Sequence, residues 1–429
     1  MINRPKGTKD VVPSEVHKWQ RVEECARESL KSRGFKEIRT PIFEHTELFV
    51  RGVGEGSDIV NKEMYTFLDK GERSITLKPE GTASIVRAFI ENGLDNEAMP
   101  QKLFMYTPCF RYERPQAGRL REHHQFSIEA FGSSSPLMEL EVIGVIKSIF
   151  DSLNFHNYLL NINSIGCKAC RKAYIEALKN YYAAHINEMC ADCKVRYEKN
   201  ALRLLDCKEE RCLSYKKDAP KPKDYLCDDC KNHYNMLKQL LKTSGVEYKE
   251  NDELVRGIDY YSRTVFEFLT VENGALGTIC AGGRYDGLVG ELGGKDLPGV
   301  GVGLGVERVL ALLDKNGIEI KAQTGVDLYI ANASQNEILA VVELAHKLRD
   351  EELCVEFDTM GRSLKAQMKY ADKIGAKNVM IIGEQELQTR KAQLKCMLNS
   401  EQEEVSLDNI SELADKVFEV YLYDEEDED

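Results

Sequence analysis

Charged and amide side chains alternate with apolar ones in the second of two strand-like runs, residues 104–113 and 124–131. Proline and glycine between the runs predict the turn of a long antiparallel hairpin. Because successive side chains of a strand point to opposite faces, Gln125, Ser127 and Glu129 share one face. An amide, a hydroxyl and a carboxylate in a row can bind a small polar molecule, although a solvated sheet face would show the same pattern.

Three arginines accompany this hairpin. Arg111 lies on the first strand, and Arg119 and Arg121 lie near the turn. Guanidinium groups bind phosphates and carboxylates through paired hydrogen bonds, so clustered arginines suit a polyphosphate. Their presence favours a ligand site over a solvated face.

Glycines alternate with apolar residues from 299 to 305. Gly301, Gly303 and Gly305 leave one face of a strand without side chains, and a flat ligand can approach such a face. The pattern turns helical near Gly305, which places Arg308 in a first helical turn. The spacing is not that of a dinucleotide-binding motif, and no Walker A sequence occurs, which disfavours a nicotinamide or P-loop enzyme.

Two other segments add polar groups. Arg256 precedes a pair of tyrosines within residues 254–261, and an Arg-Tyr-Asp run lies between glycines at 281–287. These residues could line a small polar pocket, but adjacent tyrosines are also common in cores. A strand-and-turn pattern ends at Thr82, which could cap a helix, and Glu80 beside it could be a capping or surface carboxylate.

The elements that position these residues fall into regions of different composition. Residues 162–250 are rich in lysine and cysteine and look helical, whereas the segments on both sides mix strands and helices. From residue 325, apolar strand-like runs alternate with helical stretches, as in a small α/β domain with a largely parallel sheet. We therefore predict a discontinuous domain 1–323 (1–161 plus 251–323), an insertion 162–250, a C-terminal domain 324–423 and a disordered acidic tail 424–429.

The predicted helix at residues 363–375 has two stripes. Leu364, Met368 and Ala371 form an apolar one. The basic one consists of Arg362, Lys365, Lys369 and Lys373. A basic stripe can be a solvated face or a nucleic-acid contact.

Eight of the thirteen cysteines lie in the insertion, and three Cys-x-x-Cys pairs occur among them. This spacing suits tetrahedral zinc. The candidates are Cys190, Cys193, Cys227 and Cys230. Buried thiols acting as small apolar residues are the alternative, and no catalytic zinc is predicted because no ligand spacing occurs outside the insertion.

Composition bounds the class of protein. The 429 residues are 42% hydrophobic and 30% charged, as in a soluble globular protein of several domains. We expect no membrane span and no signal peptide, and reduced thiols in the cytoplasm. The net charge of −13 argues against a non-specific nucleic-acid coat but permits selective RNA binding.

These motifs together resemble the histidyl-tRNA synthetases, class II aminoacyl-tRNA synthetases, along nearly the whole chain. Residues 34–41 are similar to motif 1 and imply a homodimer, the hairpin with Arg111 to motif 2, and the glycine strand ending at Arg308 to motif 3. The segments 254–261 and 281–287 resemble those peculiar to the histidyl enzymes. The implied fold is an α+β catalytic domain, an antiparallel sheet flanked by helices, followed by an anticodon-binding domain.

The resemblance implies that L-histidine is activated with ATP and Mg²⁺ and then joined to tRNA(His). Arg111, Arg256 and Arg308 would be catalytic. ATP would bind Arg111, Arg119, Arg121, Gly301, Gly303, Gly305 and Arg308, with adenine on the glycine face. Histidine would bind Glu80, Gly81, Thr82, Arg111, Gln125, Glu129, Arg256, Tyr260, Tyr261 and Tyr285. In that set Glu129 and Tyr261 would contact the ring nitrogens. The tRNA acceptor end would meet Arg114, Gln116 and Arg119.

A synthetase-like paralogue that regulates histidine biosynthesis without charging tRNA is the main alternative. Such paralogues usually lack the anticodon-binding domain and have degraded motifs 2 and 3, whereas this chain keeps both. A class II synthetase for another amino acid is disfavoured by the 254–261 segment and by Glu129.

Overall fold

The computed structural model describes residues 2–54, 57–115, 119–270, 277–322 and 325–426. The chain divides into two compact units, residues 1–321 and 322–429, and the cysteine-rich insertion belongs to the first. None of the described helices is long and apolar enough to cross a membrane.

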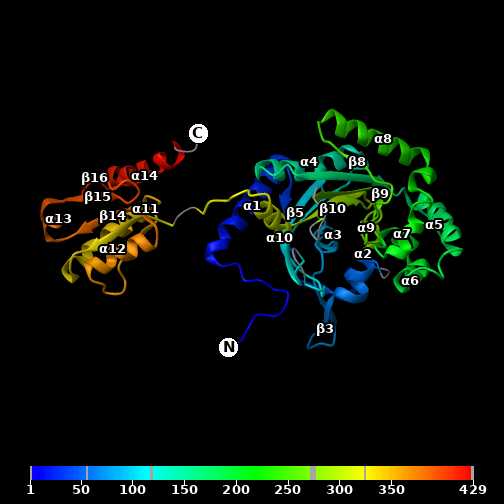
Figure 1. The fold of residues 1–429 in the computed structure, drawn as a ribbon, viewed down its shortest axis with the longest axis horizontal. Helices are drawn as coiled ribbons and strands as arrows, with labels where there is room; N and C mark the ends of the chain where they lie inside the picture. The colour runs from blue at the N-terminus through cyan, green and yellow to red at the C-terminus, as the bar shows by residue number, and fades with distance from the viewer. Residues whose placement is uncertain (1, 55–56, 116–118, 271–276, 323–324, 427–429) are drawn as a thin grey trace. The chain divides into compact units, whose positions relative to one another are not determined.

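An eight-stranded sheet forms the centre of the first unit (Figure 1). Its strands, in spatial order, are β1 (Lys36–Glu37), β5 (Gln101–Phe110), β6 (Glu122–Phe131), β11 (Gly299–Gly305), β10 (Thr278–Arg284), β9 (Ser262–Thr270), β7 (Tyr158–Ser164) and β8 (Lys249–Glu250). The six inner strands pair antiparallel, and only the short edge strands β1 and β8 pair parallel. The antiparallel sheet expected from the sequence is confirmed.

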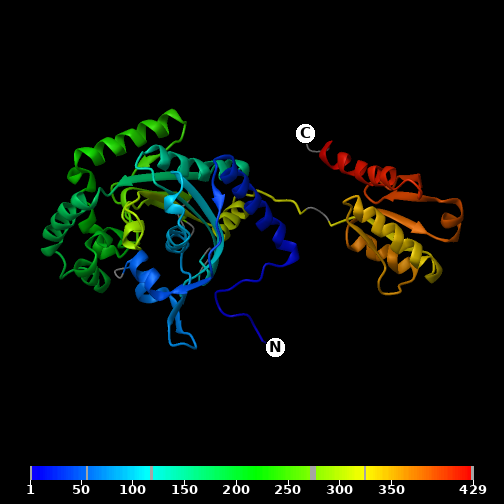
Figure 2. The same cartoon turned by 180° about the vertical axis from the view of Figure 1, so that it is seen from behind.

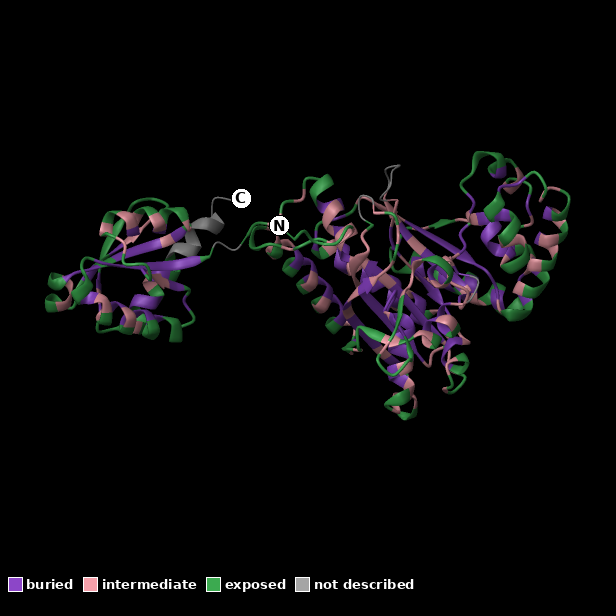
Figure 3. Ribbon diagram, turned by 90° about the horizontal axis from the view of Figure 1, so that it is seen from below, coloured by how far each residue is buried: buried purple, intermediate pink, exposed green. Residues whose placement is uncertain are grey.

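Helices cover both faces of this sheet (Figures 1 and 2). One face packs on α1 (Pro13–Ser32), α4 (Leu137–Ser152), α8 (Asp228–Thr243) and α10 (Val306–Lys315). The apolar residues of the alternating strands, including Phe126, Ile128 and Val302, are buried there. The other face meets α3 (Thr82–Glu91) and α9 (Leu288–Glu291), and α2 (Thr46–Val53) packs on these two helices. The burial pattern of the central strands is drawn in Figure 3.

A smaller three-stranded sheet, β2 (Phe43–His45), β4 (Ser74–Leu77) and β3 (Tyr65–Leu68), lies beside α2. Between α2 and β3 the chain forms a π-helix, η1 (Ile59–Glu63), and a 3-10 turn, η2 (Leu94–Asn96), follows α3. The strand β4 leads directly into α3. This order brings Glu80 and Thr82 to the central sheet.

The insertion is mostly helical, as predicted, and lies at the β7 and β8 end of the sheet (Figure 1, green). It consists of α5 (Lys168–Ala183), α6 (Ala191–Lys199), η3 (Ala201–Asp206), α7 (Glu210–Lys216), η4 (Pro222–Tyr225) and α8.

A buried ion pair ties the insertion to the sheet. Arg284 donates from Nε to Glu139 at 2.9 Å and from Nη2 to its other oxygen, and His233 of α8 contacts the same carboxylate at 2.5 Å. The side chains of Arg284 and Glu139 are 0% exposed. Burial raises the pKa of Glu139, but the hydrogen bonds and charges of Arg284 and His233 outweigh it and hold the pKa at about 2.

Replacing Glu139 with glutamine should lower the free energy of unfolding by about 3 kcal/mol at neutral pH, because it leaves Arg284 buried without its counter-ion. A carboxylate with a depressed pKa stabilises the fold above the pKa of the unfolded chain. The difference from the wild type should therefore shrink as the pH falls from about 4.5 to about 2. Denaturant titration measures both. The half-exposed control Glu141→Gln should cost less than about 1 kcal/mol, and equal losses in the two variants would contradict this account.

The second unit contains a five-stranded sheet in the order β13 (Val355–Phe357), β12 (Val326–Asn332), β14 (Ala376–Ile382), β15 (Lys391–Cys396), β16 (Gln402–Ser406). The first three strands are parallel, as the sequence predicted, whereas β15 and β16 add an antiparallel hairpin that it did not predict. The helices are η5 (Gln335–Glu337), α11 (Ile338–Asp350), α12 (Leu364–Lys373), α13 (Glu384–Thr389) and α14 (Ile410–Glu426).

The acidic end of the chain was predicted to be disordered. The helix α14 continues to Glu426, so the first three acidic residues of the tail belong to a helix, and residues 427–429 lie outside the described part of the chain.

Candidate active site

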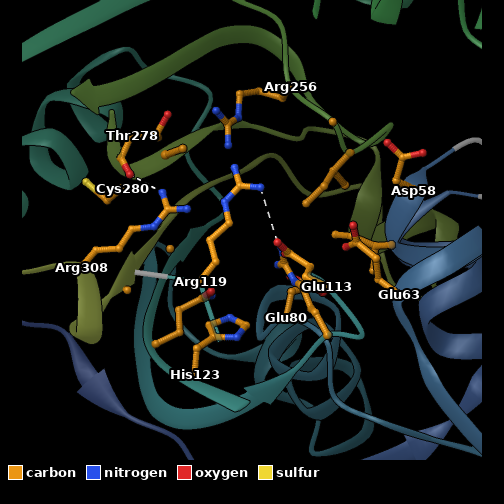
Figure 4. A pocket seen from close by; sticks show the side chains of 18 of the residues that line it. Asp58, Glu63, Glu80, Glu113, Arg119, His123, Arg256, Thr278, Cys280 and Arg308 are labelled. Carbon is orange, nitrogen blue, oxygen red and sulfur yellow. Dashed lines mark hydrogen bonds and ion pairs between the residues drawn. The ribbon is translucent and has the colours of Figure 1, made fainter. Parts of the chain in front are cut away.

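A cavity of about 410 Å³ opens on the sheet face that carries β6, β10 and β11. Its wall brings together the hairpin, the glycine strand, the 254–261 segment and the start of α3 (Figure 4). Of the residues predicted for the site, the following line it: Glu80, Thr82, Arg111, Arg119, Gln125, Arg256, Tyr260, Tyr261, Gly303, Gly305 and Arg308. Segments far apart in the sequence thus form one site.

Five arginines line the cavity, and four of them, Arg111, Arg119, Arg256 and Arg308, were predicted for the site. Arg111 is held by a hydrogen bond from its Nε to the carbonyl of Pro79 at 2.8 Å, and Arg308 donates to the carbonyl of Thr278. Figure 4 shows the side chains of Arg119, Arg256 and Arg308 directed toward one another. Burial and the charges of the other three of these four arginines lower the pKa of Arg308. Such mutual repulsion is relieved by a polyanion, and a nucleotide triphosphate is one.

Arg256 has one long ion pair and one unused hydrogen-bond donor among the described residues. Its Nη1 lies 3.4 Å from a carboxylate oxygen of Glu267. Its buried Nε has no hydrogen-bond partner among the described residues. A buried donor without a partner costs free energy, so this guanidinium is placed to donate a hydrogen bond to a ligand oxygen.

Glu80, and not Thr82, caps the helix α3. The carboxylate of Glu80 accepts hydrogen bonds from the backbone N–H groups of Thr82 and Ala83, both at 2.8 Å, and so caps α3. Thr82 is the first residue of that helix instead of its cap, and its hydroxyl donates to Glu129 at 2.7 Å. The capping alternative for Glu80 is confirmed, and Thr82 as a cap is wrong.

Glu129 lies beneath the cavity wall and is fully buried. It accepts hydrogen bonds from the hydroxyls of Thr82 and Tyr285. The ring of Tyr260 lies 4.7 Å from that of Tyr261 and 5.4 Å from that of Tyr285. Burial raises the pKa of Glu129 from 4.5 to about 8, although the two hydroxyls oppose the rise. The carboxyl is therefore mostly protonated near neutral pH.

This raised pKa predicts a pH-dependent stability. The folded chain retains the proton on Glu129 up to about pH 8, whereas the unfolded chain releases it near 4.5, so ionisation opposes folding across that window. The unfolding free energy of Glu129→Gln relative to the wild type should rise as the pH increases from about 5 to 8 and then level off, at up to about 1.4 kcal/mol per pH unit. Thermal denaturation at several pH values measures this difference, and a constant difference would contradict it.

The glycine strand makes room for side chains as well as for a ligand. Gly301 pairs with Glu129 and Gly303 with Ser127 across β6 and β11. A Cβ atom at Gly301 would lie 1.7 Å from a Glu129 oxygen, and one at Gly303 would lie 2.9 Å from the Gln125 amide nitrogen. Of the three glycines predicted to leave the face bare, Gly305 alone has no atom within 4 Å of where its Cβ atom would lie. The prediction of a bare glycine face is therefore wrong at Gly301, whose space Glu129 occupies.

Some predicted residues lie elsewhere. The guanidinium of Arg121 lies 3.9 Å above the ring of Tyr112, and it is not among the residues that line the cavity. Tyr285 and Gly301 do not line it either. Gly81 packs against buried Ser127, and Arg114 is exposed. Gln116 lies outside the described residues.

The structure also adds residues that the sequence did not single out. His123 lines the cavity, and burial and the charges of Arg111 and Arg308 lower its pKa to about 3, so it is neutral. It has the strand parity of Gln125, which is a signal that could have identified it. Arg203 of η3 reaches the cavity from the insertion and pairs with Asp58.

Two models of known protein families match this chain. The family model described as histidyl-tRNA synthetase matches residues 7–309, more than half of the chain. The chain belongs to the histidyl-tRNA synthetase family. A second model, described as an anticodon binding domain, matches residues 327–416 of the other unit.

Known members of the histidyl-tRNA synthetase family cover nearly all of the chain. The histidine–tRNA ligase of Caldanaerobacter subterraneus is 54% identical over 96% of this chain and 98% of its own length. That of Clostridium novyi is 50% identical over 97% and 99%. The crystal structure of the apo histidyl-tRNA synthetase of Staphylococcus aureus superposes with a TM-score of 0.83 at 38% identity, covering 96% of this chain and 99% of that one.

Proposed function

We propose that this chain activates L-histidine with ATP to histidyl-adenylate and pyrophosphate in the cavity of the first unit, and then transfers histidine to tRNA(His). The observation that carries the proposal is the convergence of the four predicted arginines on a cavity whose other wall holds tyrosines above a buried carboxyl. A regulatory paralogue that binds histidine alone would not need this concentration of positive charge.

The reaction brings two anions together. The carboxylate of histidine attacks the α-phosphate of ATP, a C(=O)–O–P bond forms, and the bond to pyrophosphate breaks. We assign Arg256 to the histidine carboxylate and the α-phosphate, Arg111 to the α-phosphate, and Arg308 to the γ end. Fixed positive groups in a desolvated site stabilise the charge that builds in this transition state. Little proton transfer is needed, so the neutral state of His123 is no obstacle.

Selection of the amino acid rests on groups next to the arginines. We assign Thr82, Gln125 and Glu80 to the α-ammonium group, and Glu129 and Tyr261 to the ring nitrogens, with Tyr260 and Tyr285 closing the pocket. A carboxyl already bonded to two hydroxyls can exchange one of them for a ring N–H. A pocket that leaves such buried groups unpaired with the wrong amino acid can discriminate by about 10⁴-fold.

Magnesium would accompany ATP. Glu63, Glu113 and Glu307 line the cavity and offer the carboxylate oxygens that Mg²⁺ prefers. Glu307 is engaged, because it accepts hydrogen bonds from the backbone N–H of His124 at 2.8 and 3.0 Å. We assign the ion to Glu63 and Glu113. Burial and then the charge of Glu113 raise the pKa of Glu63, and a divalent cation would offset that repulsion.

We also propose that the chain acts as a cytoplasmic homodimer. Exposed apolar side chains gather around β2 and β3 near the motif 1 segment: Ile42, Phe43, Phe67 and Leu68 are 45–66% exposed. Apolar groups of this kind are typical of an interface. Sedimentation should give twice the chain mass of 48.7 kDa.

The tRNA would contact both units. We assign its acceptor end to Arg114, Gln116 and Arg119, and its anticodon to α12. The lysines Lys365, Lys369 and Lys373 are exposed on α12, whereas Arg362 is held by Asp358 at 2.7 Å and by the ring of Tyr370. The apolar stripe packs inward, as predicted. Three of the four residues of the basic stripe, the lysines, are therefore exposed and available to RNA.

Replacing Lys365 and Lys369 together with alanine should raise the KM for tRNA about tenfold. The KM should also depend less on salt concentration, because a variant that contacts fewer phosphates releases fewer counterions when it binds. Histidine activation without tRNA should not change. Lys347 and Lys416 of the same unit, on α11 and α14, provide the matched double variant. The assignment is wrong if both pairs behave alike.

Aminoacylation tests the function directly. Radiolabelled histidine should be incorporated into a tRNA(His) transcript in the presence of ATP and Mg²⁺, and a transcript with a foreign acceptor stem and anticodon should stay uncharged. Absence of charging by folded, dimeric protein would reject the proposal.

A further inference from the structure

Eight cysteines of the insertion form two separate groups of four. The outer site contains Cys167, Cys170, Cys227 and Cys230, and the inner site contains Cys190, Cys193, Cys207 and Cys212. We propose that each site binds one structural zinc ion through four thiolates. This grouping differs from the sequence candidates, which combined the 190/193 pair with the 227/230 pair.

The sulfur positions fit a single ion in each site. All four sulfur atoms of a site lie within 4.8 Å of one another. The Sγ atoms of Cys167 and Cys170 are 3.6 Å apart, and those of Cys190 and Cys207 are 3.8 Å apart. A tetrahedron with zinc–sulfur bonds of about 2.3 Å has edges of about 3.8 Å. A disulfide requires about 2.05 Å, so these are separate thiols.

Backbone donors surround the sulfurs. In the outer site, the N–H of Cys227 donates to the Sγ of Cys170 at 3.1 Å. In the inner site, the N–H of Cys190 donates to Cys212 at 3.3 Å, and that of Cys193 to Cys190 at 3.4 Å. Hydrogen bonds from N–H groups stabilise the thiolate form that a metal requires.

The chain geometry is built for these contacts. Cys167 and Cys227 immediately precede the helices α5 and α8, each of 16 residues, so the outer site lies at two helix N-termini, where negative charge is favourable. Gly166 has a φ of +72°, and a Cβ atom there would lie 2.4 Å from the Cβ of Cys170. The turn into the outer site therefore requires glycine.

Apolar packing does not account for the outer site. The cluster around it contains only Cys170, Leu226 and Cys230 as buried members, and Cys227 is exposed. Thiols that served only as small apolar side chains would be buried among larger ones, whereas here the cysteines themselves make up the cluster. Iron–sulfur clusters place inorganic sulfide and several irons between the cysteines, and sulfurs this close together fit one ion better.

The two ions would stabilise different parts of the insertion. The outer site joins the starts of α5 and α8, and α8 carries His233 to the buried Glu139. The inner site encloses η3, since Cys193 precedes it and Cys207 follows it directly. Because η3 presents Arg203 to Asp58 at the cavity wall, the inner zinc would position a wall of the active site.

Metal analysis of the full chain, purified without chelator, tests the proposal independently of catalysis. We expect about two equivalents of zinc per chain and X-ray absorption from four sulfurs at about 2.3 Å. Cys170→Ser/Cys230→Ser and Cys193→Ser/Cys212→Ser should each lose one equivalent, while the control Cys354→Ser/Cys396→Ser in the second unit should keep both.

Replacement of the metal by cobalt in the wild-type chain gives a reading that does not require the variants to fold. Two equivalents of cobalt should produce thiolate charge-transfer absorption and the strong visible bands of tetrahedral coordination. Less than about one tenth of an equivalent of metal, a single equivalent, or iron in place of zinc would each overturn the two-site assignment.

Discussion

Replacing Arg256 with alanine should lower the rate of histidyl-adenylate formation by about 10²- to 10³-fold, or about 3–4 kcal/mol of transition-state stabilisation. The guanidinium faces the cavity, its Nε lacks a partner among the described residues, and its ion pair with Glu267 is long at 3.4 Å. Protein groups therefore neutralise this charge only in part, and the guanidinium can bind substrate.

The variant set separates charge from geometry. Arg256→Lys keeps the charge but loses the paired hydrogen bonds, so it should fall between wild type and alanine. Arg21, whose side chain is 47% exposed and which is not among the residues that line the cavity, provides the control Arg21→Ala. Single-turnover formation of histidyl-adenylate measures the step, and thermal denaturation checks folding. A folded Arg256→Ala protein with a nearly normal rate would remove Arg256 from the mechanism.

Replacing Glu129 with glutamine should reduce kcat/KM for histidine by more than about 10²-fold and leave the KM for ATP nearly unchanged, since removing a buried hydrogen-bond acceptor affects selectivity far more than bulk binding. The residue is fully buried, it organises Thr82 and Tyr285, and it does not touch the arginine cluster through any described hydrogen bond. The glutamine is the same size, but its amide nitrogen replaces one of the two oxygens that accept hydrogen bonds from Thr82 and Tyr285.

Steady-state pyrophosphate exchange with histidine and ATP varied in turn measures the two effects. Glu122→Gln, at the other end of the same strand and with the opposite strand parity, is the matched control and should behave like the wild type. Equal losses toward histidine and ATP in Glu129→Gln would mean that Glu129 supports the whole site instead of the amino-acid pocket.

The sequence predicted the local geometry of the site well, because strand periodicity is a local property. The face shared by Gln125 and Glu129 follows from alternation, and the pairing of β5 with β6 places Leu103 opposite Glu129 as a regular hairpin requires. The helix α12 followed from its two stripes. Each of these features depends on residues close together in the chain.

The errors arise where distant segments meet. The glycines of β11 looked bare until β6 was placed beside them, and then Glu129 filled the space at Gly301. Arg121 belonged to the arginine cluster by spacing, but its guanidinium lies over Tyr112 instead. The cysteines likewise could not be grouped, because three equivalent Cys-x-x-Cys pairs allow several combinations and only the path of the insertion chooses among them.

Weak local signals explain the remaining omissions. The strands β15 and β16 are rich in lysine, glutamate and glutamine, and only Ala392, Leu394 and Val405 are buried in them, so their apolar alternation is short. Arg203 lies in a helical insertion that gave no reason to expect contact with the site. It reaches the cavity only because η3 folds back toward Asp58.

The most direct test of the central claim is ATP–pyrophosphate exchange with each standard amino acid in turn. The account predicts exchange with histidine, and with histidine alone at comparable concentration, and a rate about 10²- to 10³-fold lower in Arg256→Ala. Exchange with no amino acid, or with one other than histidine, would contradict it.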